Sequence, residues 1–301
     1  MRPRDLALAV AVAAVWGVNF VVIDIGLEHF PPLLFSALRF TVAAFPAILF
    51  VGRPQVPWRW VFAVAGALGV VKFSLLFAGM AAGMPAGLSS LVLQSQAIFT
   101  MIFAVLGGRI FALGGNRTAG GERPSRRQVT GLAVAALGIV VVATRVGGGL
   151  PAGAFALVLG AAVAWGLSNV AMKKAAPPDM LRFMVWVSAC AAPPLAVLSL
   201  LFEGPPHLGA ADREAVGAVL FVALVSTLGG FGVWGALIRR YDASTVAPFS
   251  MLVPVFGIAS AAVLLGEQVH PADLIGGVLV VGGVLYGVLK VTRPAVVRVD
   301  A

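Results

Sequence analysis

The chain has 301 residues, of which 60% are hydrophobic and only 11% are charged, and its formal net charge is +9. Soluble domains average roughly 45–50% apolar and about 25% charged residues, so this composition excludes an ordinary soluble protein. The basic residues stand between apolar runs and not on one solvated face with aromatics, which argues against nucleic-acid binding. One cysteine, Cys190, excludes an internal disulfide framework and a cysteine-based metal cluster. The sequence therefore predicts an integral membrane protein, for which we expect no cofactor and no metal.

Along the chain, ten apolar stretches of about 20 residues follow one another, and this is the length that spans a bilayer. The first stretch is longer than the apolar part of a secretory signal, so we expect it to remain as a membrane helix. The predicted helices cover residues 6–25, 33–51, 60–79, 86–107, 128–145, 152–172, 181–201, 215–237, 244–265 and 272–291. The predicted fold class is an all-α, multi-pass membrane protein with ten transmembrane helices in the lipid bilayer.

Because ten is an even number, both termini are expected on one side of the membrane. The loops on that side hold most of the arginines and lysines, whereas the other side has only Arg145 and Arg213. By the positive-inside rule, the N- and C-termini and the basic loops are cytoplasmic. The longest of these loops, 107–127, is rich in glycine and arginine, and we expect it to fix the orientation.

A repeated pattern links the two halves of the chain. The matches are Trp16-Gly17-x-Asn19 with Trp165-Gly166-x-x-Asn169, and Gly131 and Gly138 with Gly276 and Gly283. Five helices are thus followed by five related helices, and an odd number per repeat forces the halves into opposite membrane orientations. We therefore predict a first five-helix repeat over 1–146 and an inverted second repeat over 150–293, with a solute site in a central cavity between them.

Several motifs give the chain a family resemblance. The first-half pattern Trp16-Gly-x-Asn-Phe20, Pro31-Pro32-x₆-Arg39-Phe40, and the second-half Met251-Leu-Val-Pro254 with Gly266-Glu267 resemble the EamA branch of the drug/metabolite transporter superfamily over nearly the whole chain. Gly83-Met-Pro-Ala-Gly87 with Gln94-x-Gln96-Ala is more similar to the branch of O-acetylserine/cysteine exporters than to the aromatic amino acid exporters. The resemblance implies a carrier of the bacterial inner membrane that exports amino acids or related metabolites.

Lys72 is the first candidate for the solute site. It lies roughly twelve residues into the third predicted helix, where inserting a lysine costs about 2.5–3.5 kcal/mol. Such a cost predicts a functional role, either binding the carboxylate of a solute or releasing a proton as the cavity closes. The alternative is structural, with Lys72 paired to a backbone carbonyl or to Gln94 or Gln96.

Gln94 and Gln96 lie near the middle of the fourth predicted helix, where their amides need partners. Two positions are about 200° apart around an α-helix, so we expect only one of them to line the solute path. We favour Gln94, with Lys72 as its charged partner across the path. For Gln96, hydrogen bonding between helices is an equally open interpretation.

Two aromatic faces complete the candidate site. Trp16 shares a helix face with Asn19 and Phe20, and Trp165 shares one with Asn169, because these residues stand three or four positions apart. Aromatic walls with a nearby amide suit an amphipathic solute of amino-acid size, although close packing around the adjacent glycines is the alternative. Two weaker candidates, which are more often core residues, are Phe73 and Phe77. We interpret Arg39 as structural, either extending its charged end to the membrane interface or paired with Glu28 or Asp24.

These features favour a secondary transporter that exports amino acids or small metabolites by alternating access. Its partners would be a small-molecule solute and either a coupled proton or the solute gradient alone, and no nucleic acid. A carrier of drug-like or nucleotide-sugar-like solutes is the alternative. No Gly-x₄-Gly-Lys-Ser/Thr loop for ATP is present. An intramembrane enzyme would need a nucleophile with a base, and the apolar stretches contain no histidine.

Overall fold

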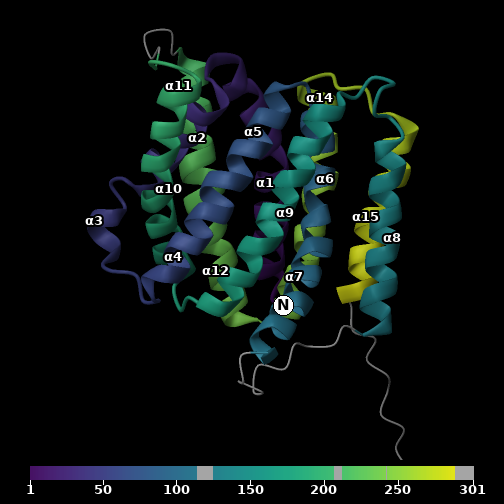
Figure 1. Cartoon of the computed structure of the whole chain (residues 1–301), viewed down its shortest axis with the longest axis horizontal. Helices are drawn as coiled ribbons and strands as arrows, with labels where there is room; N and C mark the ends of the chain where they lie inside the picture. Colours follow the sequence, from purple (N-terminus) through teal and green to yellow (C-terminus); the bar gives the residue numbers. More distant parts are fainter. Residues whose placement is uncertain (114–124, 207–211, 242, 289–301) are drawn as a thin grey trace, which may run out of the picture.

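The computed structural model describes residues 1–113, 125–206, 212–241 and 243–288, and the regular elements within these ranges are all helical. Figure 1 shows the long helices running side by side. The first-half elements are α1 (Pro3–His29), α2 (Pro32–Ala44), α3 (Ile48–Val51), α4 (Trp58–Val64), η1 (Ala65–Lys72), α5 (Phe73–Ala81), α6 (Ala86–Val92), η2 (Leu93–Ser95), α7 (Gln96–Leu113) and α8 (Arg126–Ala143). The second-half elements are α9 (Ala152–Ala175), α10 (Met180–Phe202), α11 (Arg213–Leu220), η4 (Phe221–Gly229), α12 (Gly230–Arg240), α13 (Ala243–Val246), η5 (Ala247–Leu252), α14 (Val253–Leu264) and α15 (Pro271–Val288).

Eight helical spans in the described ranges are long and apolar enough to cross a membrane. Each has a stretch of high mean hydropathy with few charges, and much of its surface is not covered by protein. Two further apolar helices, α2 and α15, are shorter. The chain is therefore a multi-pass, all-α membrane protein.

The prediction of one continuous second helix over 33–51 is wrong beyond Ala44, where α2 ends. The chain leaves the helical conformation at Phe45, whose backbone is extended, and α3 adds only one turn after the break. The physical reason is Pro46, because proline lacks the N–H that a helix needs and disfavours the helical conformation in the residue before it. The apolar pattern continues through this proline, which is why hydropathy alone predicts one helix.

The predicted loop over 107–127 begins later than expected. Helix α7 continues to Leu113, so the first seven residues of this segment are helical. Two glycines at 107 and 108 cost a helix only about 1 kcal/mol each, and the apolar residues that follow them in the sequence favour its continuation. The remainder of the segment up to residue 124 lies outside the described residues.

Four irregular stretches interrupt the spanning helices. The span Trp58–Ala81 contains the π-helical turn η1, and the span Arg213–Arg240 contains the π-helical turn η4. The 3₁₀ turns η2 and η5 precede α7 and α14. Such stretches are uncommon inside helices and often mark functional sites. Each half of the chain thus contains one π-helical turn and one 3₁₀ turn among its described residues.

Glycines bring helix backbones close together at several places in the described structure. Gly17 of α1 lies against Val253 and Gly257 of α14, and Gly166 of α9 lies against Phe99 and Thr100 of α7. At one edge of the bundle, α8 and α15 form a pair in which four glycines face each other's helix (Figure 1). These glycines are Gly131 and Gly138 in α8 and Gly276 and Gly283 in α15. Small residues allow this close approach in membrane proteins.

Candidate functional site

A cavity of about 380 Å³ lies between the helices of the two halves. Its walls come from α1, α2, η1, α5 and the α6–η2–α7 span of the first half, and from α9, α10, η4, α12, η5 and α14 of the second half. All four irregular stretches contribute to its lining. The volume falls within the range of small-molecule sites, and the lining is mostly apolar with a few polar groups, which is the usual composition of such sites.

Nine of the ten residues predicted to bind the solute line this cavity. They are Trp16, Asn19, Phe20, Lys72, Phe73, Gln94, Gln96, Trp165 and Asn169. The tenth, Phe77, does not line it. Phe77 is fully buried one turn beyond Phe73, with the two rings 5.7 Å apart in an edge-to-face contact. Phe77 packs in the core, in contact with Phe35 as well.

Both glutamines of the fourth span line the cavity, so the prediction that only one does is wrong. The reason is the 3₁₀ turn η2, which covers Leu93–Ser95. A 3₁₀ helix advances about 120° per residue, whereas an α-helix advances about 100°. Two positions in a 3₁₀ helix are therefore roughly 240° apart, which is about 120° by the shorter way round the axis. In an α-helix they are roughly 200° apart, which is about 160° by the shorter way. Gln94 and Gln96 thus reach the same cavity from different sides.

The amide of Gln94 does not contact Lys72 as predicted. Its nitrogen donates to the backbone carbonyl of Ser250, at 3.3 Å, and lies 3.7 Å from the sulfur of Met251. Both residues belong to the 3₁₀ turn η5, in which part of the regular α-helical hydrogen bonding is replaced. Gln94 therefore joins the irregular stretch of one half to that of the other.

Gln96 forms an amide pair with the second half. Asn169 Nδ2 of α9 donates to Gln96 Oε1 at 2.6 Å and to Thr100 Oγ1 at 3.1 Å. Thr100 in turn donates to the backbone carbonyl of Gln96. The interhelical hydrogen bond left open for Gln96 is thus present, and it lies at the wall of the cavity.

Lys72 has aromatic neighbours instead of the polar ones expected for a structural lysine. Its Nζ lies 3.4 Å from the centroid of the Phe73 ring and 5.0 Å from that of Trp165. It is 5% exposed, and within the described part of the chain it makes no hydrogen bond and no ion pair. Cation–π contacts with Phe73 and Trp165 hold a positive charge without neutralising it.

Arg39 is the main cavity residue whose role was predicted incorrectly from the sequence. It does not pair with Glu28 or Asp24, but lines the cavity with 2% exposure, and its Nη2 donates to Thr227 Oγ1 of η4 at 2.7 Å. Its guanidinium carbon lies 3.9 Å from the Phe73 ring centroid. The insertion cost that singled out Lys72 applies equally to this arginine, and that signal could have identified it.

The second half supplies an aromatic wall that the sequence pattern mostly did not predict. Trp16 packs against Phe231 and Trp234 of α12, with ring centroids 5.4 and 5.1 Å apart, and its indole nitrogen donates to the carbonyl of Ser226 at 3.0 Å. These three second-half residues also line the cavity, as do two methionines, Met172 and Met180. A wall of this kind accommodates flexible apolar groups of different shapes.

The cavity reaches one end of the bundle, where α1 begins and α12 ends. At this end Tyr241 donates to Asp5, 2.6 Å away. The lining residue Ile238 is 37% exposed here, whereas the lining residues Ile23 and Leu76 toward the opposite end are at most 1% exposed. The cavity lining is therefore partly exposed toward the end where α1 begins and buried toward the opposite end, which we call the closed end.

Two carboxylates join the halves at the closed end. Glu203, directly after α10, accepts from the backbone N–H groups of Leu33 and Leu34 in α2, at 2.7 and 2.9 Å. Glu267, after α14, accepts in the same way from Ala86 and Gly87 in α6, at 2.6 and 3.1 Å. A carboxylate at a helix N-terminus binds unpaired N–H groups and the positive end of the helix dipole.

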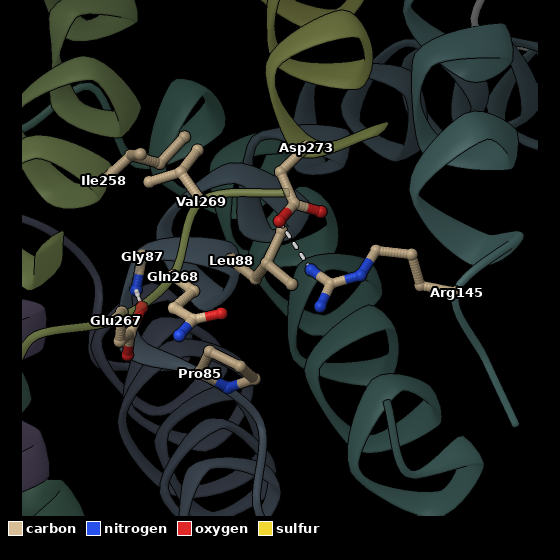
Figure 2. A pocket seen from close by; sticks show the side chains of 9 residues that line it. All are labelled: Pro85, Gly87, Leu88, Arg145, Ile258, Glu267, Gln268, Val269 and Asp273. Carbon is tan, nitrogen blue, oxygen red and sulfur yellow. Dashed lines mark hydrogen bonds and ion pairs between the residues drawn. The ribbon is translucent and has the colours of Figure 1, made fainter. Parts of the chain in front are cut away.

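An ion pair lies beside the second of these carboxylates. Figure 2 shows Arg145 reaching Asp273 in a small pocket that Glu267 also lines. Asp273 stands in the first turn of α15, and Arg145 follows the end of α8. Together these contacts connect helix ends of the two halves at that end of the bundle.

Two segments of the chain, residues 5–144 and 152–288, each match the model of the EamA-like transporter family. The chain belongs to this family. It is 41% identical to a probable amino-acid metabolite efflux pump of Salmonella typhimurium, over 98% of this chain and 99% of that protein. It is 37% identical to a probable amino-acid metabolite efflux pump of Escherichia coli over the full length of both. It is 28% identical to a probable terminal-alkyne amino-acid exporter of Streptantibioticus cattleyicolor, over 90% and 88% of the two chains.

One crystal structure of a protein with 20% identity has the same fold as this EamA-like chain, with a TM-score of 0.64 and 95% and 96% of the two chains covered. The resemblance predicted from the motifs is therefore confirmed at the level of the family. Family and relatives indicate a transporter and not an enzyme.

Proposed function

We propose that this protein is a secondary transporter that exports amino acids or related small metabolites across the bacterial inner membrane by alternating access. The observation that carries the proposal is the central cavity, which both halves line with amides, aromatic rings and two cations, and whose described lining contains no aspartate or glutamate. Such a lining suits an amphipathic solute with a carboxylate and disfavours a cationic drug. Relatives named as amino-acid metabolite efflux pumps support the same solute class.

We propose further that the chain has ten transmembrane helices in two inverted five-helix repeats, over 1–146 and 150–293. Several features support this arrangement: the family model matches twice, the π-helical turns η1 and η4 correspond, and the 3₁₀ turns η2 and η5 correspond. Gly17 packs on α14 and Gly166 packs on α7, which is the exchange of contacts that a twofold relation between halves requires. In this scheme α2 and α15 are the two shorter membrane helices.

With the termini in the cytoplasm, as the positive-inside rule predicts, the partly exposed end of the cavity faces the cytoplasm and the closed end faces outward. An exporter must load its solute from the cytoplasm, and this conformation is the loading state. The contacts of Glu203 and Glu267 then act as the outer gate, because both connect a second-half segment to the start of a first-half helix.

The function is tested with purified protein in liposomes. We expect saturable movement of labelled amino acids, accelerated when the opposite side is preloaded with unlabelled amino acid, because a carrier that alternates exchanges its solute. Protein-free liposomes give the background. Repeating the assay with and without an imposed pH gradient separates proton exchange from transport down the solute gradient. If no labelled amino acid moves above background, the proposed function is wrong.

The outer gate gives a separate prediction. Glu267→Gln keeps the side-chain shape but removes the charge and leaves one acceptor oxygen for two N–H groups, so we expect the closed state to lose about 1–3 kcal/mol. The reporter is a cysteine introduced by Ser90→Cys, at a buried position of the cavity lining. Cys190→Ser removes the native cysteine, so that only the reporter is labelled. Labelling by a membrane-impermeant maleimide from outside should become about 5- to 100-fold faster.

The matched control for the gate is Glu214→Gln, because Glu214 is an exposed glutamate in the first turn of α11. This control makes the same chemical change at a residue outside the gate, so it should leave the labelling rate of the reporter cysteine unchanged. The decisive comparison is therefore Glu267→Gln against Glu214→Gln, both in the same reporter background. Equal labelling rates in these two variants would exclude Glu267 from the gate.

A further inference from the structure

Arg39 is a buried cation most of whose hydrogen-bond donors have no partner. It is only 2% exposed in α2, yet only Nη2 of its guanidinium has a hydrogen-bond partner, and the N–H groups on Nε and Nη1 have none. Buried donors of a charged group are rarely left without partners, because the cost of removing them from water is then uncompensated. Since Arg39 lines the cavity, a molecule bound there is the natural partner.

A second polar atom of the cavity lining has the same property. Asn19 Oδ1, in α1, is buried and accepts no hydrogen bond. Among the described residues that line the cavity, only Arg39 and Asn19 have buried side-chain polar atoms without partners. The atoms without hydrogen-bond partners are thus N–H donors on the Arg39 cation and an acceptor oxygen on the neutral amide of Asn19. An α-amino acid carries the complementary pair, a carboxylate that accepts and an ammonium that donates.

The two cations of the cavity are close together and lack an internal counter-ion. Both lie over the Phe73 ring, Arg39 Cζ at 3.9 Å and Lys72 Nζ at 3.4 Å from its centroid, so they are at most 7.3 Å apart, the sum of these distances. None of the ion pairs between described residues includes either of them. A carboxylate between Arg39 and Lys72 would be within reach of both and would relieve their repulsion.

We propose that Arg39 and Lys72 together hold the carboxylate of the solute, with Arg39 as the anchor, and that Asn19 Oδ1 accepts from its ammonium group. This assignment rests on the proposed function and names the solute class: compounds with a free carboxylate, bound most tightly when an α-ammonium is also present. Amides and esters of amino acids are excluded, because they present no anion to the two cations.

The test measures binding, which does not depend on transport. The melting temperature of the detergent-purified protein is followed against the concentration of each common amino acid, its amide and its N-acetyl derivative. For wild type, the free and N-acetyl acids should raise the melting temperature, and the amides should not. Arg39→Gln should weaken binding of both acids about 10- to 100-fold. Asn19→Ala should bind the free and N-acetyl acids equally.

Thr227→Val separates binding from a structural role of Arg39, because it removes the Arg39–Thr227 hydrogen bond and keeps the charge. This variant should keep the preference for acid over amide even if its melting temperature falls. If Arg39→Gln does not fold, Arg39→Lys replaces it as the test variant. Because lysine retains a cation, Arg39→Lys should keep part of the preference for acids over amides. Amides that bind as tightly as acids, or unchanged acid binding in Arg39→Gln, would overturn the proposal while leaving amino-acid transport standing. Arg39-dependent binding of acids without transport would overturn the function and leave this assignment standing.

Discussion

Lys72→Met should lower the rate of saturable amino-acid export about 10- to 100-fold while leaving the protein inserted and folded. The substitution removes the charge and keeps a side chain of similar length. Lys72 makes no hydrogen bond to the rest of the described chain, and its Nζ lies beside the rings of Phe73 and Trp165. Its loss therefore costs the solute a charge-assisted hydrogen bond, worth about 1.5–3 kcal/mol.

The same variant discriminates between the functional and the structural interpretation of Lys72 through stability. Lys72 and Arg39 are at most 7.3 Å apart, the sum of their distances to the Phe73 centroid, so at an effective dielectric constant of about 20 they repel by about 2 kcal/mol or more. Without solute, Lys72→Met should therefore melt at the same or a higher temperature than wild type. If Lys72 held helices together, the melting temperature would fall.

The matched control is Arg59→Met, an exposed cation near the start of the same membrane span. Export by this variant should stay within about twofold of wild type. Both variants are reconstituted at equal protein density, and initial rates are compared over a range of amino-acid concentrations. Wild-type export by Lys72→Met would remove Lys72 from the solute site.

Five polar residues of the cavity lining were predictable because polar groups inside a membrane must find partners within the protein. Asn19, Lys72, Gln94, Gln96 and Asn169 all stand in apolar stretches, and all five line the cavity. This reasoning needs only the depth of each residue in its helix. It identifies residues that face the interior of the bundle, and here the interior contains the cavity.

The errors arise where helix geometry or depth depends on the rest of the structure. Phe73 and Phe77 share a helix face by spacing, but Phe77 lies one turn farther toward the closed end and is covered by Phe35. Gln94 and Gln96 reach the same cavity only because η2 is a 3₁₀ turn. No proline or other local signal inside that turn announces it, so the sequence of one helix could not reveal it.

For the fold as well, features set by the local sequence were predictable, and features set by the rest of the structure were not. Hydropathy locates the membrane helices, because the length of an apolar stretch is a property of the local sequence. The early end of α2 was encoded by Pro46, and its effect was hidden by the apolar residues on both sides. The irregularity of η5 has local markers in Pro248 within the turn and Pro254 directly after it, whereas the π-helical turns η1 and η4 contain no proline.

Gly166→Val should destabilise the protein strongly and disrupt the amide pair beside it. A Cβ atom at Gly166 would lie 2.7 Å from Phe99 Cβ and 2.9 Å from the backbone nitrogen of Thr100, so α9 must move away from α7. Overpacking in a well-packed region costs about 1–3 kcal/mol, and more when the backbone itself is met. Because Asn169 lies one turn farther along α9, its hydrogen bond to Gln96 should be lost as well.

The control for this substitution is Gly153→Val in the same helix, where a Cβ atom meets nothing within 4 Å. Both variants change the intrinsic helix propensity alike, so the difference between their melting temperatures reports the α7–α9 contact alone. We expect Gly153→Val to melt near wild type and Gly166→Val at least several degrees lower, with amino-acid export lost. Equal melting temperatures would mean that the stability of the protein does not depend on this close approach of α9 to α7.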